Sequence, residues 1–184
     1  MSDAAFDYTQ VQHTACPGCG HDASAIPPAD LAAALVDIGR RWREFLGAVT
    51  DHPGGVDALC VRPNEDTWAA LEYACHVRDV LSLFTRRVEL TLLTHRPAHG
   101  WWDHEQAAVD EYYLAQDPIA VADDLEHSAL ELADLVQPLH PEAWERTSTR
   151  VDVEFTVAGL VRFAWHEAAH HLEDARAVVP APSL

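Results

Sequence analysis

The chain has 184 residues, of which 48% are hydrophobic and 23% are charged, a composition typical of a single globular domain. Twelve basic residues, all of them arginine, face 30 acidic ones, and the net charge of −18 argues against nucleic acids and anionic membranes as partners. The sequence contains no apolar run of about 20 residues and no secretory signal pattern, which predicts a cytoplasmic protein that does not cross a membrane.

Two segments of different character are predicted. Residues 1–29 are polar and are interrupted by prolines and by the motif CPGCG at residues 16–20, so we expect an irregular N-terminal segment. Residues 30–180 form the predicted helical domain. Its first helix, residues 31–49, places apolar side chains at spacings of three and four, with Asp30 as a candidate N-cap.

Three further helices are predicted from the same apolar periodicity. Residues 67–95, with Asp66 as a candidate N-cap, are apolar on nearly all sides, which is typical of a central, buried helix. Residues 118–137 begin with a proline in the first turn, and residues 157–178 follow Thr156 as a candidate N-cap. Four long helices in this order predict an all-α, up-and-down-type four-helix bundle.

The connections between the helices carry weaker signals. Residues 101–116 are expected to form a short helix or an ordered crossover. Residues 146–155 alternate between polar and apolar side chains, which fits either a loop or a poor hairpin.

Twelve histidines make metal binding the first functional question, because histidine is the commonest metal ligand. His166 and His170 are four residues apart in an apolar helix and share a face, so both can bind one ion. A solvated histidine-rich face is the alternative, since His171 is adjacent.

The string HEAAH also fits the zinc-peptidase motif HExxH. Only fourteen residues follow His170, however, and Glu173 stands where the extended motif needs glycine, so we do not expect a peptidase.

His76 is the predicted third ligand. It lies among apolar residues of the second long helix and shares a face with Glu72 and Asp79. A histidine in such a helix can also be a hydrogen-bonded core residue. Together with His166 and His170 it would complete a three-histidine site across the bundle core, where such sites are often built.

This pattern resembles the DinB/YfiT-like superfamily of metal-dependent bundle proteins. The resemblance rests on Trp68 and His76 in one helix and on His166 and His170 some 90 residues later, and it covers about residues 30–178. It implies a four-helix bundle, a divalent metal on the three histidines and frequent homodimers. The superfamily includes transferases and isomerases that use mycothiol, bacillithiol or glutathione.

The predicted function follows from that ligand set. Three imidazoles leave a position open on a zinc-like ion, which suits catalysis. The resemblance therefore implies a metal-dependent enzyme, and we predict a transferase or isomerase that uses a small thiol, such as mycothiol, on a small-molecule electrophile. A zinc hydrolase and a non-enzymatic metal-binding or stress-response protein are the alternatives. Zinc is the expected metal, with nickel as a second choice. Asp79 or Glu173 is expected to orient a ligand imidazole, and Glu167 is not expected to act as a base.

The CPGCG motif is the second predicted metal site. Its glycine permits a tight turn in which the sulfur atoms of Cys16 and Cys19 converge, as in a zinc knuckle. A structural zinc ion there would fasten the N-terminal segment to the bundle. An inert reduced pair and a redox pair remain alternatives, although the second lacks its usual helix and βαβ context. The candidates for the two remaining ligands are, in order of preference, His13 and His21, then Cys60 and His52.

Overall fold

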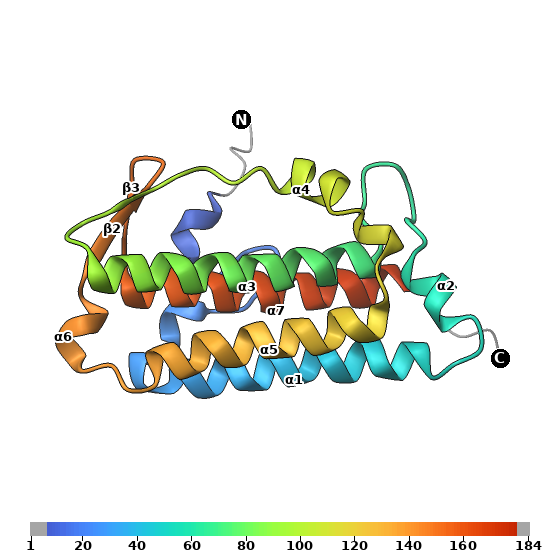
Figure 1. Cartoon of the computed structure of the whole chain (residues 1–184), viewed down its shortest axis with the longest axis horizontal. Coiled ribbons are helices and arrows are strands. Elements are labelled where there is room, and N and C mark those ends of the chain that lie inside the picture. The colour runs from blue at the N-terminus through green and yellow to red at the C-terminus, as the bar shows by residue number, and fades with distance from the viewer. Residues whose placement is uncertain (1–6, 180–184) are drawn as a thin grey trace.

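Four long helices packed side by side make up most of the computed structural model, which describes residues 7–179 (Figure 1). They are α1 (Leu31–Thr50), α3 (Ala70–Leu93), α5 (Pro118–Val136) and α7 (Val157–Val178). Each bound lies within three residues of its predicted value, and the predicted all-α four-helix bundle is confirmed. Residues 1–6 and 180, at the outer ends of the two predicted segments, lie outside the described residues.

The order of the helices around the bundle departs from a simple up-and-down arrangement. Helix α1 packs mainly against α5, whereas α3 packs against both α5 and α7. Residues 94–117 cross the length of the bundle, so α3 and α5 run in the same direction (Figure 1). This crossover carries α4 (His104–Asp110) and the 3₁₀ helix η4 (Tyr113–Ala115), which confirms an ordered crossover with a short helix.

Short elements close the two ends of the bundle. Helix α2 (Gly55–Leu59) follows α1, and α6 (Pro141–Trp144) follows α5. Strand β2 (Thr147–Arg150) pairs antiparallel with β3 (Val153–Thr156) and parallel with the two-residue strand β1 (Ala98–His99). Of the two structures that the alternating pattern allowed, the hairpin is the one found. Val151 and Asp152 at its tip both have positive φ, as a type I′ hairpin turn requires.

The N-cap prediction holds for α7 but not for α3. The hydroxyl of Thr156 accepts a hydrogen bond of 2.9 Å from the backbone N–H of Gly159, as predicted. The prediction that Asp66 caps α3 is wrong, because α3 begins four residues later. There the carboxylate of Glu72 accepts a hydrogen bond from the backbone N–H of Ala69.

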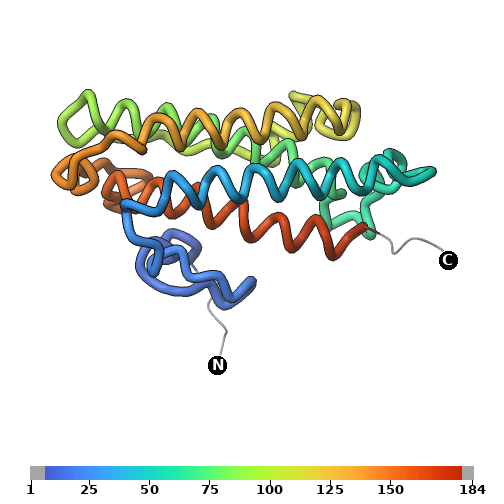
Figure 2. The backbone as a smooth tube through the Cα atoms, turned by 90° about the horizontal axis from the view of Figure 1, so that it is seen from below, coloured from blue at the N-terminus to red at the C-terminus, as the bar shows by residue number. Residues whose placement is uncertain are grey.

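The N-terminal segment, residues 7–30, packs along α7 (Figure 2). It contains the 3₁₀ helices η1 (Tyr8–Gln12), η2 (Ala23–Ala25) and η3 (Pro28–Asp30) and no long helix or strand, as predicted. Gly159 provides space for this contact, since a Cβ atom there would lie 2.3 Å from Oε1 of Gln12. No helix within residues 7–179 is both long and apolar enough to span a membrane.

Candidate functional site

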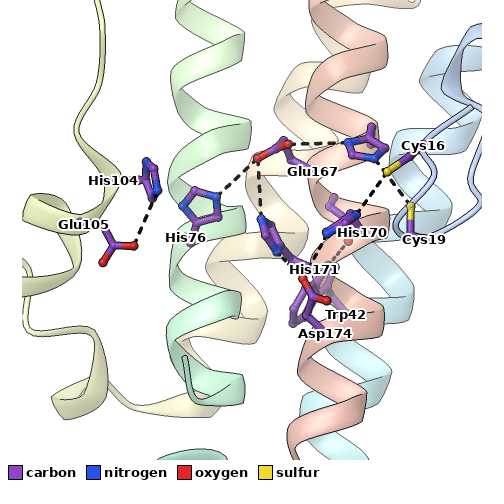
Figure 3. Close-up of polar contacts among 12 residues, drawn as sticks. Cys16, Cys19, Trp42, His76, His104, Glu105, Glu167, His170, His171 and Asp174 are labelled. Carbon is purple, nitrogen blue, oxygen red and sulfur yellow. Dashed lines mark hydrogen bonds and ion pairs between the residues drawn. The ribbon is translucent and has the colours of Figure 1, made fainter. Parts of the chain in front are cut away.

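Helix α7 presents two neighbouring rows of polar side chains near its centre. His166 and His170 form one row, and Glu167 and His171 form the other. Residues four apart share a helix face, and the adjacent row is turned by about 100°. The first row faces the N-terminal segment and the second faces α3 (Figure 3). Two clusters of metal-ligand side chains therefore join α7 to other parts of the chain, and a third group, His170, His171 and Asp174, lies within α7 itself.

The second row meets α3 in what we call the pocket cluster, which consists of His76, Glu167 and His171. Oε2 of Glu167 lies 3.6 Å from Nε2 of His76 and 3.7 Å from Nε2 of His171 (Figure 3). All three ligand atoms lie within 4.8 Å of one another. This spacing allows the three side chains to bind one ion.

Aromatic rings and a carboxylate hold the two imidazoles of the pocket cluster in place. The ring of His76 stacks on Trp102 at a centroid distance of 5.6 Å, and that of His171 stacks on Tyr73 at 5.3 Å. Nδ1 of His171 lies 2.9 Å from Oδ2 of Asp174, so this nitrogen donates a hydrogen bond to the carboxylate and leaves Nε2 facing the cluster. Such an outer carboxylate fixes the tautomer of a metal-binding histidine.

Polar contacts and burial compete in setting the charges of the cluster. Burial raises the pKa of Glu167, but contacts with His166, His171 and His76 outweigh it and hold the pKa well below its ordinary value. Burial lowers the pKa of His171, but Asp174 and Glu167 outweigh it and raise the pKa to about 9. Burial lowers the pKa of His76. Without metal, the cluster at neutral pH thus has a carboxylate, a neutral imidazole and an imidazolium.

The pocket cluster lies at the edge of a cavity of about 500 Å³ between α3, α7, the crossover and the start of the N-terminal segment. Aromatic side chains form much of its wall. Arg87 and Arg150 also line it, and neither forms an ion pair within residues 7–179. Arg150 lies over the ring of Phe163, and its buried Nε atom has no hydrogen-bond partner among the described residues. The cavity therefore offers ligand atoms and two guanidinium groups, and four carboxylates, those of Asp7, Asp66, Glu105 and Glu167, line it as well.

The first row of α7 meets the CPGCG turn in what we call the knuckle cluster: Cys16, Cys19, His166 and His170. Sγ of Cys16 lies 3.7 Å from Nδ1 of His170, and Sγ of Cys19 lies 3.6 Å from Nε2 of His166. Of these four residues, only His170 lines the cavity.

The structure groups the predicted site residues differently from the sequence interpretation. His76 lies with Glu167 and His171, whereas His166 and His170 lie with the two cysteines. The two rows on α7 are turned by about 100° from each other. Helix α3 packs on one side of α7, so it cannot contact both rows equally. Only one row can face α3.

The two histidines proposed to complete the knuckle are also placed elsewhere. His13 is exposed at the end of η1. The ring of His21 packs edge-on against Trp165 at 5.8 Å. Neither belongs to the knuckle cluster, and His166 and His170 stand in the positions that these residues were expected to fill.

Sequence reasoning missed Glu167 and His171. The signal was present, because Glu167 and His171 have the same four-residue spacing as the chosen pair. Asp79 or Glu173 was predicted to orient a ligand imidazole, but the carboxylate that contacts Nδ1 of His171 is that of Asp174. Asp79 instead accepts a hydrogen bond from Tyr113 and pairs with a neighbouring arginine.

A comparison with models of protein families shows to which family the chain belongs. A model described as the DinB superfamily matches residues 37–175, well over half of the chain. The chain belongs to the DinB superfamily. The resemblance drawn from the histidine pattern is thereby confirmed. This DinB protein is also similar in fold to a solved structure from Bacillus subtilis, whose description reads "YfiT from Bacillus subtilis is a probable metal-dependent hydrolase with an unusual four-helix bundle topology". The TM-score is 0.68 at 17% identity, over 82% of this chain and 86% of that one. No curated protein matches the sequence.

Proposed function

We propose that this DinB protein is a metal-dependent hydrolase of small anionic molecules, with the ion held by His76, Glu167 and His171. The observation that carries the proposal is the convergence of these three side chains at a cavity of about 500 Å³. Two histidines and a glutamate with an open fourth position are a known ligand set of hydrolytic zinc enzymes. The description of YfiT as a probable metal-dependent hydrolase agrees with this proposal.

The distances between the ligand atoms of the pocket cluster suit a shared metal ion better than direct hydrogen bonds among the three side chains. In a tetrahedral site with bonds of about 2.0–2.1 Å, neighbouring nitrogen and oxygen ligands lie about 3.4 Å apart. The observed separations from Glu167 to His76 and His171, 3.6 and 3.7 Å, are near this value and longer than a normal hydrogen bond. Nδ1 of His76, which is not the nitrogen that contacts Glu167, is buried without a hydrogen-bond partner among the described residues, so no outer group holds this imidazole as Asp174 holds His171. A divalent ion held by this set would polarise a substrate carbonyl and lower the pKa of a bound water.

The side chains around the cluster have separable tasks in this proposal. Asp174 holds the proton on Nδ1 of His171 and so keeps Nε2 available. Glu167 reduces the positive charge at the centre. Trp102 and Tyr73 cover the two imidazoles and exclude water from their flat faces.

The substrate class follows from Arg87 and Arg150. Arg87 is buried and Arg150 is half-buried, and each guanidinium group lies over an aromatic ring and forms no ion pair within residues 7–179. Burial and the other arginine lower the pKa of Arg87 to about 10, which still leaves it cationic at neutral pH. Arginine pairs of this kind bind carboxylate or phosphate groups. We therefore expect a substrate with an anionic group besides the bond that is cleaved.

Thiol transfer, the function implied by the resemblance, remains a second proposal. It is favoured by the cavity, which has room for a small thiol beside an electrophile. An open metal position binds a thiolate as well as water. Mycothiol is the cofactor proposed for this alternative, and zinc or nickel is the proposed metal for both.

A turnover screen separates these functions. The zinc-loaded protein is incubated with small anionic esters, amides and electrophiles, with and without small thiols. We expect hydrolysis that needs metal but no thiol, that a His76→Ala/His171→Ala variant loses, and that a His127→Ala/His140→Ala variant retains. Strictly thiol-dependent turnover would establish the transferase instead. Metal binding at the cluster without any turnover would favour a metal-binding protein.

A further inference from the structure

We infer that Cys16, Cys19, His166 and His170 form a second metal site, a closed zinc site that fastens the N-terminal segment to α7. It is separate from the pocket cluster, and its ligands come from two parts of the chain about 150 residues apart. Two thiolates and two imidazoles are a common ligand set of structural zinc.

The distances between ligand atoms match such a site. With Zn–S bonds of about 2.3 Å and Zn–N bonds of about 2.0–2.1 Å, sulfur and nitrogen ligands of a tetrahedral ion lie about 3.5–3.6 Å apart. The separation is 3.6 Å between Cys19 and His166 and 3.7 Å between Cys16 and His170. All four ligand atoms lie within 4.8 Å of one another. The side chains therefore already surround a volume of the right size.

The backbone of the CPGCG turn is shaped to bring the two sulfur atoms together. The N–H of Cys16 donates to the carbonyl of His21, and the N–H of Gly20 donates to the carbonyl of Cys16. Gly20 has a φ of 75°, which favours glycine. A Cβ atom at Gly18 would lie 3.2 Å from Cε1 of His170, so a glycine lets the turn approach the imidazole.

A carboxylate oxygen lies near the second nitrogen of each histidine, although neither contact is a hydrogen bond. His166 directs Nε2 toward Cys19, and its Nδ1 lies 3.6 Å from Oε1 of Glu167. His170 directs Nδ1 toward Cys16, and its Nε2 lies 3.4 Å from Asp174. A carboxylate at the second nitrogen is the usual partner of a zinc-bound histidine. Nδ1 of His166 is buried and has no hydrogen-bond partner within residues 7–179.

Burial marks the site as structural rather than catalytic. Cys16 is 1% exposed and His166 is fully buried. Four protein ligands leave no position for substrate, and only His170 borders the cavity. Because Glu167 and Asp174 contact both clusters, the closed site also fixes the two carboxylates that support the pocket cluster.

Metal content and cobalt spectroscopy test the inference on full-length protein purified without a metal-affinity tag. We expect two zinc equivalents per chain and, after exchange with Co²⁺, a thiolate-to-cobalt charge-transfer band. Cys16→Ser/Cys19→Ser should retain one equivalent and lose the band. His76→Ala/His171→Ala should also retain one equivalent but keep the band, so failure of this site and failure of the pocket cluster give different results.

Matched variants identify the ligands. Cys60→Ser removes a cysteine outside the cluster and should leave both metal content and band unchanged. His13→Ala/His21→Ala should also keep the band, whereas His166→Ala/His170→Ala should lose it. A band that survives loss of His166 and His170, or disappears with His13 and His21, would overturn the proposed ligand set.

Alkylation of the wild-type protein gives an answer even if the cysteine variants do not fold. We expect zinc to slow alkylation of Cys16 and Cys19 at least tenfold relative to chelator-treated protein, with little effect on Cys60. Equal rates with and without zinc would show that the two cysteines are an unmetallated pair and would overturn the inference. A disulfide between them in freshly purified protein would do the same and identify a redox pair.

Discussion

Glu167 is in contact with both clusters, and its carboxylate explains how they can lie next to each other. Oε2 faces His76 and His171, whereas Oε1 faces His166 (Figure 3). One carboxylate therefore contacts three imidazoles, and the imidazolium of His171 supplies the opposite charge in a place where an unpaired charge would be costly. The residue is a ligand for one proposed site and an outer partner for the other.

Glu167→Gln tests this dual role at the residue scale. The amide keeps the shape of the side chain but removes its charge, so the zinc affinity of the pocket cluster should fall by about 100-fold or more. Chelator competition measures the effect, and the thiolate-to-cobalt band should remain. Glu173→Gln is the matched control, because Glu173 pairs with arginines on the surface and should leave both readouts unchanged. Equal zinc affinity in the two variants would contradict the assignment.

The proton on His171 predicts a pH dependence of metal binding. Burial opposes this proton, but Asp174 and Glu167 raise the pKa of His171 from 6.5 to about 9, so the proton has to leave before Nε2 can bind an ion. Zinc affinity of the pocket cluster should rise about tenfold per pH unit from pH 6.5 to 9 and then level off. Titrations in the Cys16→Ser/Cys19→Ser background measure this cluster alone. An affinity that is constant over this range would refute the predicted proton release.

The same pKa has the opposite consequence for the metal-free protein. A histidine with a raised pKa stabilises the folded state fully below its ordinary pKa, here 6.5, and loses this contribution as the pH rises through about 9. The free energy of unfolding of the metal-free protein should therefore decrease over this range, and a His171→Gln variant should show a smaller decrease. Urea denaturation at a series of pH values measures the difference.

Arg150 gives a prediction about substrate binding. Its guanidinium lies between aromatic rings at the cavity and has no carboxylate partner within residues 7–179. A hydrogen bond to a charged group contributes about 1.5–3 kcal/mol, so Arg150→Gln should raise KM for an anionic substrate by about tenfold to hundredfold. The value of kcat should change little, because Arg150 is not in the pocket cluster. Arg86→Gln, on the exposed face of α3, is the control and should leave KM unchanged.

At the scale of elements, α7 matters most because it carries residues of both clusters. Its start is fixed by the cap from Thr156 to Gly159, and its first turns pack on the N-terminal segment. Thr156→Ala should lower the free energy of unfolding by about 1 kcal/mol, the usual effect of losing such a cap. Thr94→Ala, at an exposed position after α3, should change it much less. Chemical denaturation checks both, and equal effects would show that the cap contributes nothing.

The four long helices could be predicted from the sequence because their apolar residues recur with helical spacing over long, regular stretches. The start of α3 was placed too early because Asp66 looks like a cap, whereas Glu72 satisfies the backbone N–H from inside the helix. The pairing of rows on α7 could not be predicted, since both 166/170 and 167/171 have helical spacing. Which row faces α3 depends on the rotation of the packed helix, which long-range contacts determine.

At the scale of the whole molecule, the crossover and the N-terminal segment enclose one region from opposite sides. The crossover brings Trp102 over His76, and the N-terminal segment brings the CPGCG turn to α7 (Figure 2). Neither placement follows from local sequence signals, because both join residues that are far apart in the chain. The sequence did identify His76, His166, His170, Cys16 and Cys19 as chemically important and paired Cys16 with Cys19 and His166 with His170, but it placed the histidine pair with His76 instead of the cysteines.

The most direct test is a crystal structure of the zinc-loaded protein with anomalous difference maps on both sides of the zinc absorption edge. Two peaks are predicted, one bounded by His76, Glu167 and His171 at the cavity and one by the four side chains of the knuckle cluster. Purification without a metal-affinity tag and soaking in a chelator-buffered zinc solution would keep weakly bound surface ions out. A single peak coordinated by His76, His166 and His170, or no peak at the cavity, would contradict the central claim.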